Sequence, residues 1–174
     1  MTISFFGKGS CDVDSFEYKT AFDIASKLAR KGHIIASGGY GGVMEAVLKA
    51  ASKFNVERIG ITCSEIKDRK PNKYITQHIV TETYLQRLEK LIKIADGYIV
   101  LPGDTGTLLE LSAIWALKKR DIIDKPVVCI GEQWQNIIET VGFYSANAIS
   151  EVCLIQFADD AKSAIDKINK CLKI

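Results

Sequence analysis

Short apolar runs alternate with longer amphipathic stretches from one end of the chain to the other. Several runs, such as Tyr98–Leu101 and Val127–Ile130, are apolar at every position, as in strands covered on both faces of a parallel sheet. Strands are predicted at Ile3–Phe6, His33–Ala36, Arg58–Thr62, Ile75–Val80, Gly97–Leu101, Pro126–Ile130 and Val152–Phe157. Helices are predicted at Phe16–Lys31, Gly42–Phe54, Tyr84–Ala95, Thr107–Lys119, Glu132–Val141 and Ala158–Leu172. This order predicts an α/β fold, with a doubly wound parallel sheet of about seven strands and helices on both faces.

Length and charge limit the classes of protein to which the chain can belong. Its 174 residues suit one compact domain, spanning residues 1–174. The net charge of +2 comes from 23 basic and 21 acidic residues spread along the chain, which disfavours a nucleic-acid surface or a membrane-surface helix. We therefore expect a small molecule as the partner, and neither a nucleic acid nor a membrane.

Five cysteines are widely spaced without a Cys-x-x-Cys pair, so neither a disulfide framework nor a zinc knuckle is expected. Reduced thiols suit a cytoplasmic location. The N-terminus lacks the basic lead of a signal segment, and no apolar run approaches the roughly 18 residues that cross a membrane. The two histidines, His33 and His78, have no acidic cluster at ligand spacing, so we expect no metal and no other cofactor.

The segment Leu101–Glu110, with the sequence LPGDTGTLLE, joins the end of a predicted strand to the start of a predicted helix. Glycines there allow a ligand to approach the backbone, and the free amides of a helix N-terminus favour an anion such as phosphate. Glu110 lies one turn inside the helix, within reach of the same ligand. The alternative interpretation is a tight turn in which the glycines serve only backbone geometry.

Two further glycine-bearing loops, Gly7–Ser10 and Ser37–Gly42, also follow predicted strands. In a doubly wound sheet such loops open on one crevice at the carboxyl ends of the strands. None of the three loops reads Gly-x-Gly-x-x-Gly or carries the Gly-Lys-Ser/Thr of a P-loop, so a monophosphate is favoured over a dinucleotide or triphosphate. The candidate phosphate- and nucleotide-binding residues are Gly7, Lys8, Ser10, Ser37, Gly38, Gly39, Gly42, Pro102, Gly103, Asp104, Thr105, Gly106 and Thr107.

Arg87 lies near the start of the helix predicted at Tyr84–Ala95, off its apolar stripe. That stripe, which we expect to face the core, comprises Leu85, Leu88, Leu91, Ile92 and Ala95. A solvated surface arginine is one interpretation. The other is that Arg87 reaches the crevice, because this end of the helix lies on the side where the glycine loops open.

The basic run Lys67–Lys73 also has two interpretations: it is either a solvated loop or a lid over the site.

Arg87 and the later segment Pro102–Glu110 together resemble the Lonely Guy (LOG) family of nucleoside 5′-monophosphate phosphoribohydrolases. The motif of that family reads Pro-Gly-Gly-x-Gly-Thr-x-x-Glu, with an arginine upstream. The segment Ser37–Val47 is similar to the family's Gly-Gly-Gly-x-x-Gly-Leu-Met segment, and Trp115 followed by Lys125–Val127 is similar to its next helix and strand. The resemblance implies a Rossmann-like fold and a homodimer with sites near the subunit interface.

In that family the arginine and the last glutamate of the motif are the catalytic pair, which implies that Arg87 and Glu110 are catalytic here. The implied reaction is hydrolysis of an N-glycosidic bond, as in cytokinin riboside 5′-monophosphates, with release of a free base and ribose 5-phosphate. Its transition state resembles an oxocarbenium ion, which a carboxylate stabilises. The resemblance also implies that the amides of Gly103, Gly106 and Thr107 hold the phosphate.

Two residues depart from the family pattern. Asp104 replaces the second glycine of the motif, and Leu88 replaces the lysine that usually follows the arginine; both changes weaken anion binding. Either the phosphate then lies elsewhere, near Lys8 or Ser10, or the chain binds another ligand.

The main alternative function is a non-catalytic carrier, because relatives with similar motifs bind molybdenum cofactor without hydrolysing it. Lysine decarboxylase, another label of this family, is disfavoured because no segment suggests a pyridoxal phosphate site.

Overall fold

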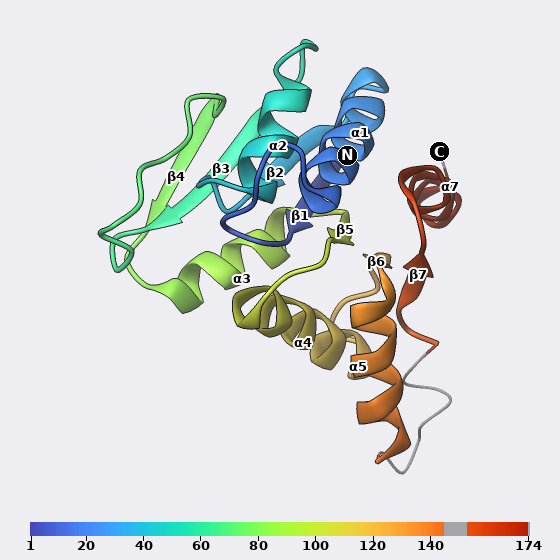
Figure 1. Cartoon of the computed structure of the whole chain (residues 1–174). Helices are drawn as coiled ribbons and strands as arrows, with labels where there is room; N and C mark the ends of the chain where they lie inside the picture. Colours follow the sequence, from blue (N-terminus) through green and yellow to red (C-terminus); the bar gives the residue numbers. More distant parts are fainter. Residues whose placement is uncertain (145–152, 174) are drawn as a thin grey trace.

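Seven parallel strands form one sheet in the order β4-β3-β2-β1-β5-β6-β7 in the computed structural model, which describes residues 1–144 and 153–173. The strands are β1 Thr2–Phe6, β2 Ile34–Ser37, β3 Arg58–Cys63, β4 Gln77–Thr81, β5 Gly97–Val100, β6 Val127–Ile130 and β7 Gln156–Ala158. The helices are α1 Phe16–Arg30, α2 Val43–Ala51, α3 Tyr84–Ile94, α4 Thr105–Lys119, α5 Glu132–Phe143 and α7 Ala161–Leu172. The predicted doubly wound, Rossmann-like α/β fold is confirmed (Figure 1).

Helices cover both faces of this sheet (Figure 1). One apolar layer joins the sheet to α1, α2 and α7, and the other joins it to α3, α4 and α5. Neighbouring side chains of β1 enter opposite layers, Phe5 the first and Phe6 the second. Strands β5 and β6 are buried at every residue, which explains why their sequences are apolar without alternation.

The sheet reverses its order at β1, with β2 to β4 on one side and β5 to β7 on the other. At such a reversal the loops that leave the carboxyl ends of neighbouring strands diverge and leave a crevice between them. The loops after β1, β2 and β5 carry the three glycine segments, so the fold directs all three toward one edge of the sheet, as predicted.

Some predicted boundaries of strands and helices are wrong, and so is the predicted burial of Leu85. Residues Cys153–Ile155 form a turn rather than the start of a strand, while Val152 lies outside the described residues. The last helix begins at Ala161 rather than Ala158 because the Asp160 carboxylate accepts a hydrogen bond from the Ser163 amide at 2.7 Å, which caps the helix. Leu85 was expected in the core but is 67% exposed, since no element among residues 1–144 and 153–173 covers it.

All five cysteines are free thiols. Within residues 1–144 and 153–173, no helix has the length and apolar content needed to cross a bilayer.

Candidate active site

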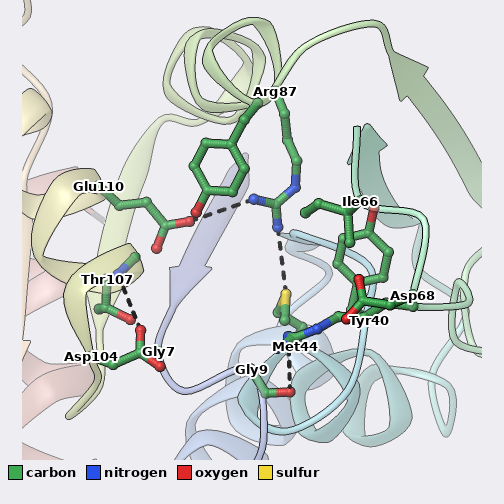
Figure 2. A pocket seen from close by; sticks show the side chains of 13 residues that line it. Gly7, Gly9, Tyr40, Met44, Ile66, Asp68, Arg87, Asp104, Thr107 and Glu110 are labelled. Atoms are coloured by element: carbon green, nitrogen blue, oxygen red, sulfur yellow. Dashed lines mark hydrogen bonds and ion pairs between the residues drawn. The ribbon is translucent and has the colours of Figure 1, made fainter. Parts of the chain in front are cut away.

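A cavity of about 300 Å³ lies at the carboxyl edge of the sheet (Figure 2). Six residues predicted for the site line it: Gly7, Arg87, Asp104, Gly106, Thr107 and Glu110. Seven others that were not assigned to the site line it as well: Gly9, Tyr40, Met44, Ile66, Asp68, Arg69 and Tyr84. The volume suits one small ligand and lies at the lower end of the range for ligand pockets.

Arg87 is buried at the inner end of the cavity, with 4% of its surface exposed. Its Nε donates a hydrogen bond to the Ile61 carbonyl at 2.7 Å, and Nη2 contacts the Met44 sulfur at 3.6 Å. The guanidinium carbon lies 5.5 Å from the ring centroids of both Tyr40 and Tyr84. Stacking on aromatic faces partly replaces the water that a buried guanidinium loses, so Arg87 is held in one orientation. It is therefore not a solvated surface arginine.

Gly38 makes room for this arrangement. A Cβ atom at this position would overlap the Arg87 guanidinium and crowd the Met44 sulfur. Gly38 does not line the cavity itself, so its contribution is space for the arginine.

Glu110 projects from α4 toward Arg87 (Figure 2). Its Oε1 lies 3.9 Å from Arg87 Nη1, which makes an ion pair at the limit of contact rather than a hydrogen bond. Burial raises the pKa of the Glu110 carboxyl to about 8, although the Arg87 charge opposes the rise. The carboxyl therefore exchanges its proton near neutral pH, as a general acid or base requires.

Tyr84 completes the polar wall between Arg87 and the start of α4. A Cβ atom on Gly106 would lie 3.3 Å from the Tyr84 hydroxyl, so Gly106 leaves room for this side chain above the helix terminus. Burial and the nearby Glu110 charge raise the pKa of the Tyr84 hydroxyl above its ordinary value. Tyr84 consequently remains a protonated donor that faces the cavity.

The loop between β5 and α4 is held by the first turn of α5. Gln133 accepts a hydrogen bond from the Gly103 amide at 3.2 Å and donates one to the Gly103 carbonyl at 2.7 Å. Trp134 is fully buried, and its Nε1 donates to the Leu101 carbonyl at 2.9 Å. The Gly103 amide, for which a phosphate was expected, thus already has a partner within the chain.

Asp104 is the N-cap of α4, and its carboxylate accepts a hydrogen bond from the Gly106 amide at 3.1 Å. The negative side chain lies where the positive end of the helix dipole attracts anions. Two of the three amides expected to hold phosphate, those of Gly103 and Gly106, therefore have intramolecular acceptors. Thr107 is buried and lines the cavity beside them.

The other predicted binding residues lie outside the cavity wall. Lys8 forms an ion pair with Glu17, and Ser37 is fully buried beneath the loop, where its hydroxyl donates to the Met44 carbonyl at 3.3 Å. Gly42 has φ +61°, and a side chain there would meet the Lys8 carbonyl. Ser10, Gly39, Pro102 and Thr105 do not line the cavity. Gly42 and Ser37 therefore shape the loops that surround the cavity rather than its surface.

Five of the unpredicted wall residues had a signal in the sequence. Tyr40 and Met44 belong to the glycine segment after β2, and Tyr84 lies three residues before Arg87, on the same side of the helix. Arg69 belongs to the basic run Lys67–Lys73, for which a loop over the site was one of two interpretations. Part of that run, Asp68 and Arg69, does line the cavity.

Comparison with known proteins places the chain in a family. A sequence profile of the SLOG cluster4 family matches residues 1–156. The chain belongs to this family. It is 30% identical over 132 residues to an uncharacterized protein of Archaeoglobus fulgidus, a match that covers 75% of this chain and 83% of that protein. It is also 26% identical over 149 residues to the cytokinin riboside 5′-monophosphate phosphoribohydrolase of Mycobacterium marinum, a match that covers 80% of each chain.

The fold of the SLOG chain also matches solved structures. The molybdenum cofactor binding protein of Rippkaea orientalis superposes with a TM-score of 0.77 at 20% identity, covering 98% of this chain and 95% of that one. At this identity the likeness shows the fold alone. The predicted resemblance to LOG proteins and, in fold, to molybdenum cofactor carriers is confirmed. No group of three or more possible metal ligands gathers within residues 1–144 and 153–173 of the SLOG chain.

Replacing Glu110 by glutamine is expected to change how the stability of this SLOG protein depends on pH. Burial raises the pKa of the Glu110 carboxyl from an ordinary value of 4.5 to about 8. Between these pH values the native state keeps a proton that the unfolded chain has released, so the free energy of unfolding falls as the pH rises. Glutamine has no such proton. The stability of Glu110→Gln relative to wild type should therefore increase from pH 5 to pH 8, by at most about 1.4 kcal/mol per pH unit.

Urea unfolding at pH 5, 6.5 and 8 measures this difference. Glu139→Gln, at an exposed glutamate of α5, is the matched control and should follow the wild type at each pH. A Glu110→Gln variant with the same pH dependence as wild type would show that the carboxyl is not held protonated in the native state.

Proposed function

We propose that this protein hydrolyses the N-glycosidic bond of a nucleoside 5′-monophosphate and releases a free base and ribose 5-phosphate. The observation that carries the proposal is the buried pair of Arg87 and Glu110, which face each other across one cavity at the carboxyl edge of the sheet. The named activity of the Mycobacterium marinum relative supports it. The cavity volume of about 300 Å³ also suits a mononucleotide better than a dinucleotide.

Glu110 is the residue that acts on the sugar. Cleavage of an N-glycosidic bond builds positive charge on C1′ and the ring oxygen before water attacks. A carboxylate beside C1′ stabilises that charge and orients the water, whose hydroxyl joins C1′ while its proton goes to the departing base. The low polarity that raises the Glu110 pKa also strengthens its attraction for the developing cation, since little water screens the pair.

Arg87 and Tyr84 position the reacting groups. Arg87 has its Nε engaged by the Ile61 carbonyl, so Nη1 is the donor that faces Glu110 and, in the complex, a ribose oxygen. The rings of Tyr40 and Tyr84 prevent the guanidinium from turning away. A fixed arginine lets the binding energy of the sugar be used for orientation, because little side-chain freedom is lost when the substrate arrives.

A non-catalytic carrier of molybdenum cofactor is the second candidate. The superposition on the Rippkaea orientalis binding protein, with a TM-score of 0.77, favours it, as does the Asp104 carboxylate at the start of α4. The buried pair of Arg87 and Glu110 favours the hydrolase, because a carrier has no need for a carboxyl that titrates near neutral pH.

We also retain a single nucleotide-binding domain and, on the basis of five free thiols, a cytoplasmic location as parts of the proposal.

The purified protein is expected to release free base from at least one member of a panel of nucleoside 5′-monophosphates that includes a cytokinin riboside monophosphate. Chromatography of the reaction mixture measures the base. Since the Glu110 carboxylate is the active form, kcat/KM should rise with pH up to about 8. Glu110→Gln should lower kcat by roughly 10²-fold to 10⁴-fold with an unchanged circular dichroism spectrum.

The Glu139→Gln variant serves as the control and should retain wild-type turnover. Release of base from no member of the panel would exclude the hydrolase and favour the carrier. Full turnover by a folded Glu110→Gln variant would remove this residue from the mechanism.

We propose further that two copies of the chain pair through α3. The exposed Leu85 and Ile122 belong to an apolar groove that also includes Leu88, Ile92, Leu117 and Ile123. Acidic and basic residues, namely Glu89, Lys93, Asp124 and Lys125, lie side by side along the groove. In a two-fold pair the same surface meets itself, so a rim with both signs of charge can pair with its own copy. The contact would also stabilise the helix that carries Arg87.

Light scattering after gel filtration measures the mass of the particle. We expect a dimer for the wild type and a monomer for Leu85→Glu, because the charge would be buried without a partner in the contact. Val13→Glu, at an apolar residue of similar exposure outside the groove, is the control and should remain dimeric. A wild-type monomer, or a dimeric Leu85→Glu variant, would contradict pairing through this groove.

A further inference from the structure

The start of α4 is occupied by the chain's own side chains. The Asp104 carboxylate accepts from the Gly106 amide at 3.1 Å, and Gln133 binds both the amide and the carbonyl of Gly103. A phosphate placed there would have to displace these contacts and approach the Asp104 charge. Like charges at such short range repel, so the helix terminus is an unfavourable site for the phosphate of a substrate.

Two of the cations near the cavity are already engaged. Lys8 pairs with Glu17 and does not line the cavity wall. Arg87 is buried at the inner end beside Glu110, where the sugar is expected. Arg69 also lines the cavity, and within residues 1–144 and 153–173 no carboxylate lies within 4.0 Å of its guanidinium. Its positive charge is therefore not neutralised by a paired carboxylate and can bind an anionic ligand.

The Arg69 side chain reaches from the loop between β3 and β4 to the loop after β1. Its Nη1 lies 3.5 Å from the Gly9 carbonyl, and a Cβ atom at Gly9 would lie 2.4 Å from the same nitrogen. The β3–β4 loop is held nearby by Asn72, whose backbone amide donates to the Gly39 carbonyl at 2.9 Å and whose Nδ2 donates to the Tyr40 carbonyl at 2.9 Å. The exposed Arg69 side chain thus lies beside Gly9 at the rim of the cavity.

We propose that Arg69 binds the 5′-phosphate of the substrate at the rim of the cavity, over Gly7 and Gly9, in place of the start of α4. This assignment rests on the proposed function for the identity of the substrate. The guanidinium can bind two phosphate oxygens at once, and the glycines leave the backbone accessible beside it. Asp68, which lines the same rim, is the opposing charge that limits the affinity. The ribose then extends inward toward Arg87 and Glu110.

Isothermal titration with ribose 5-phosphate and with ribose tests the assignment without requiring turnover. Arg69→Ala should weaken the binding of ribose 5-phosphate by about tenfold or more and leave the binding of ribose unchanged. Arg69→Lys keeps the charge without the two-oxygen contact, so its affinity should lie between those of Arg69→Ala and wild type. Lys70→Ala removes the same charge from the next residue of the loop, which does not line the cavity, and should bind as wild type does.

The outcomes separate this assignment from the proposed function. If Arg69→Ala binds ribose 5-phosphate as tightly as Lys70→Ala does, the phosphate lies elsewhere and the assignment is wrong, whether or not wild type releases base. If Arg69→Ala selectively loses ribose 5-phosphate but wild type releases no base from any nucleotide, the phosphate site stands and the hydrolase is wrong. With an active wild type, the same variant should raise KM for the monophosphate and leave kcat within about twofold.

Discussion

The burial of one guanidinium organises the functional edge of this protein. Moving the charge of Arg87 out of water costs several kcal/mol unless its donors are matched and its charge is compensated. The chain meets this requirement with the Ile61 carbonyl, the Met44 sulfur, the rings of Tyr40 and Tyr84, and Glu110. These groups come from the end of β3, the loop after β2 and the helices α2, α3 and α4. Arg87 therefore fixes how the loops on both sides of the sheet reversal meet.

Glu110 benefits from the same arrangement. At 3.9 Å from Nη1 it receives too little stabilisation from the guanidinium to offset its burial, so its pKa rises to about 8 rather than falling. A carboxyl in this condition is poised to take or give a proton near neutral pH, and it attracts a developing cation strongly. The water-poor environment, in which Arg87 needs several partners, is thus also what raises the Glu110 pKa and suits its carboxyl to proton transfer.

Much of this arrangement follows from the sequence, and the remainder depends on tertiary contacts. Apolar runs such as Val127–Ile130 identify buried parallel strands because strands covered on both faces need no polar residues. Arg87 and Glu110 could be paired only through a family motif, since the burial of Arg87 depends on Gly38 and Tyr40, which lie far away in the chain. The partners of Gly103 and the exposure of Leu85 could not be predicted, because each depends on which elements pack nearby.

The central claim is that one sugar ring lies between Arg87 and Glu110. A crystal structure of Glu110→Gln in complex with adenosine 5′-monophosphate tests it most directly, because this variant keeps the shape of the site while slowing cleavage. The account predicts electron density for the ribose between the two residues, with C1′ in contact with the side chain of residue 110. A nucleotide bound outside this cavity, or a ribose in contact with neither residue, would contradict it.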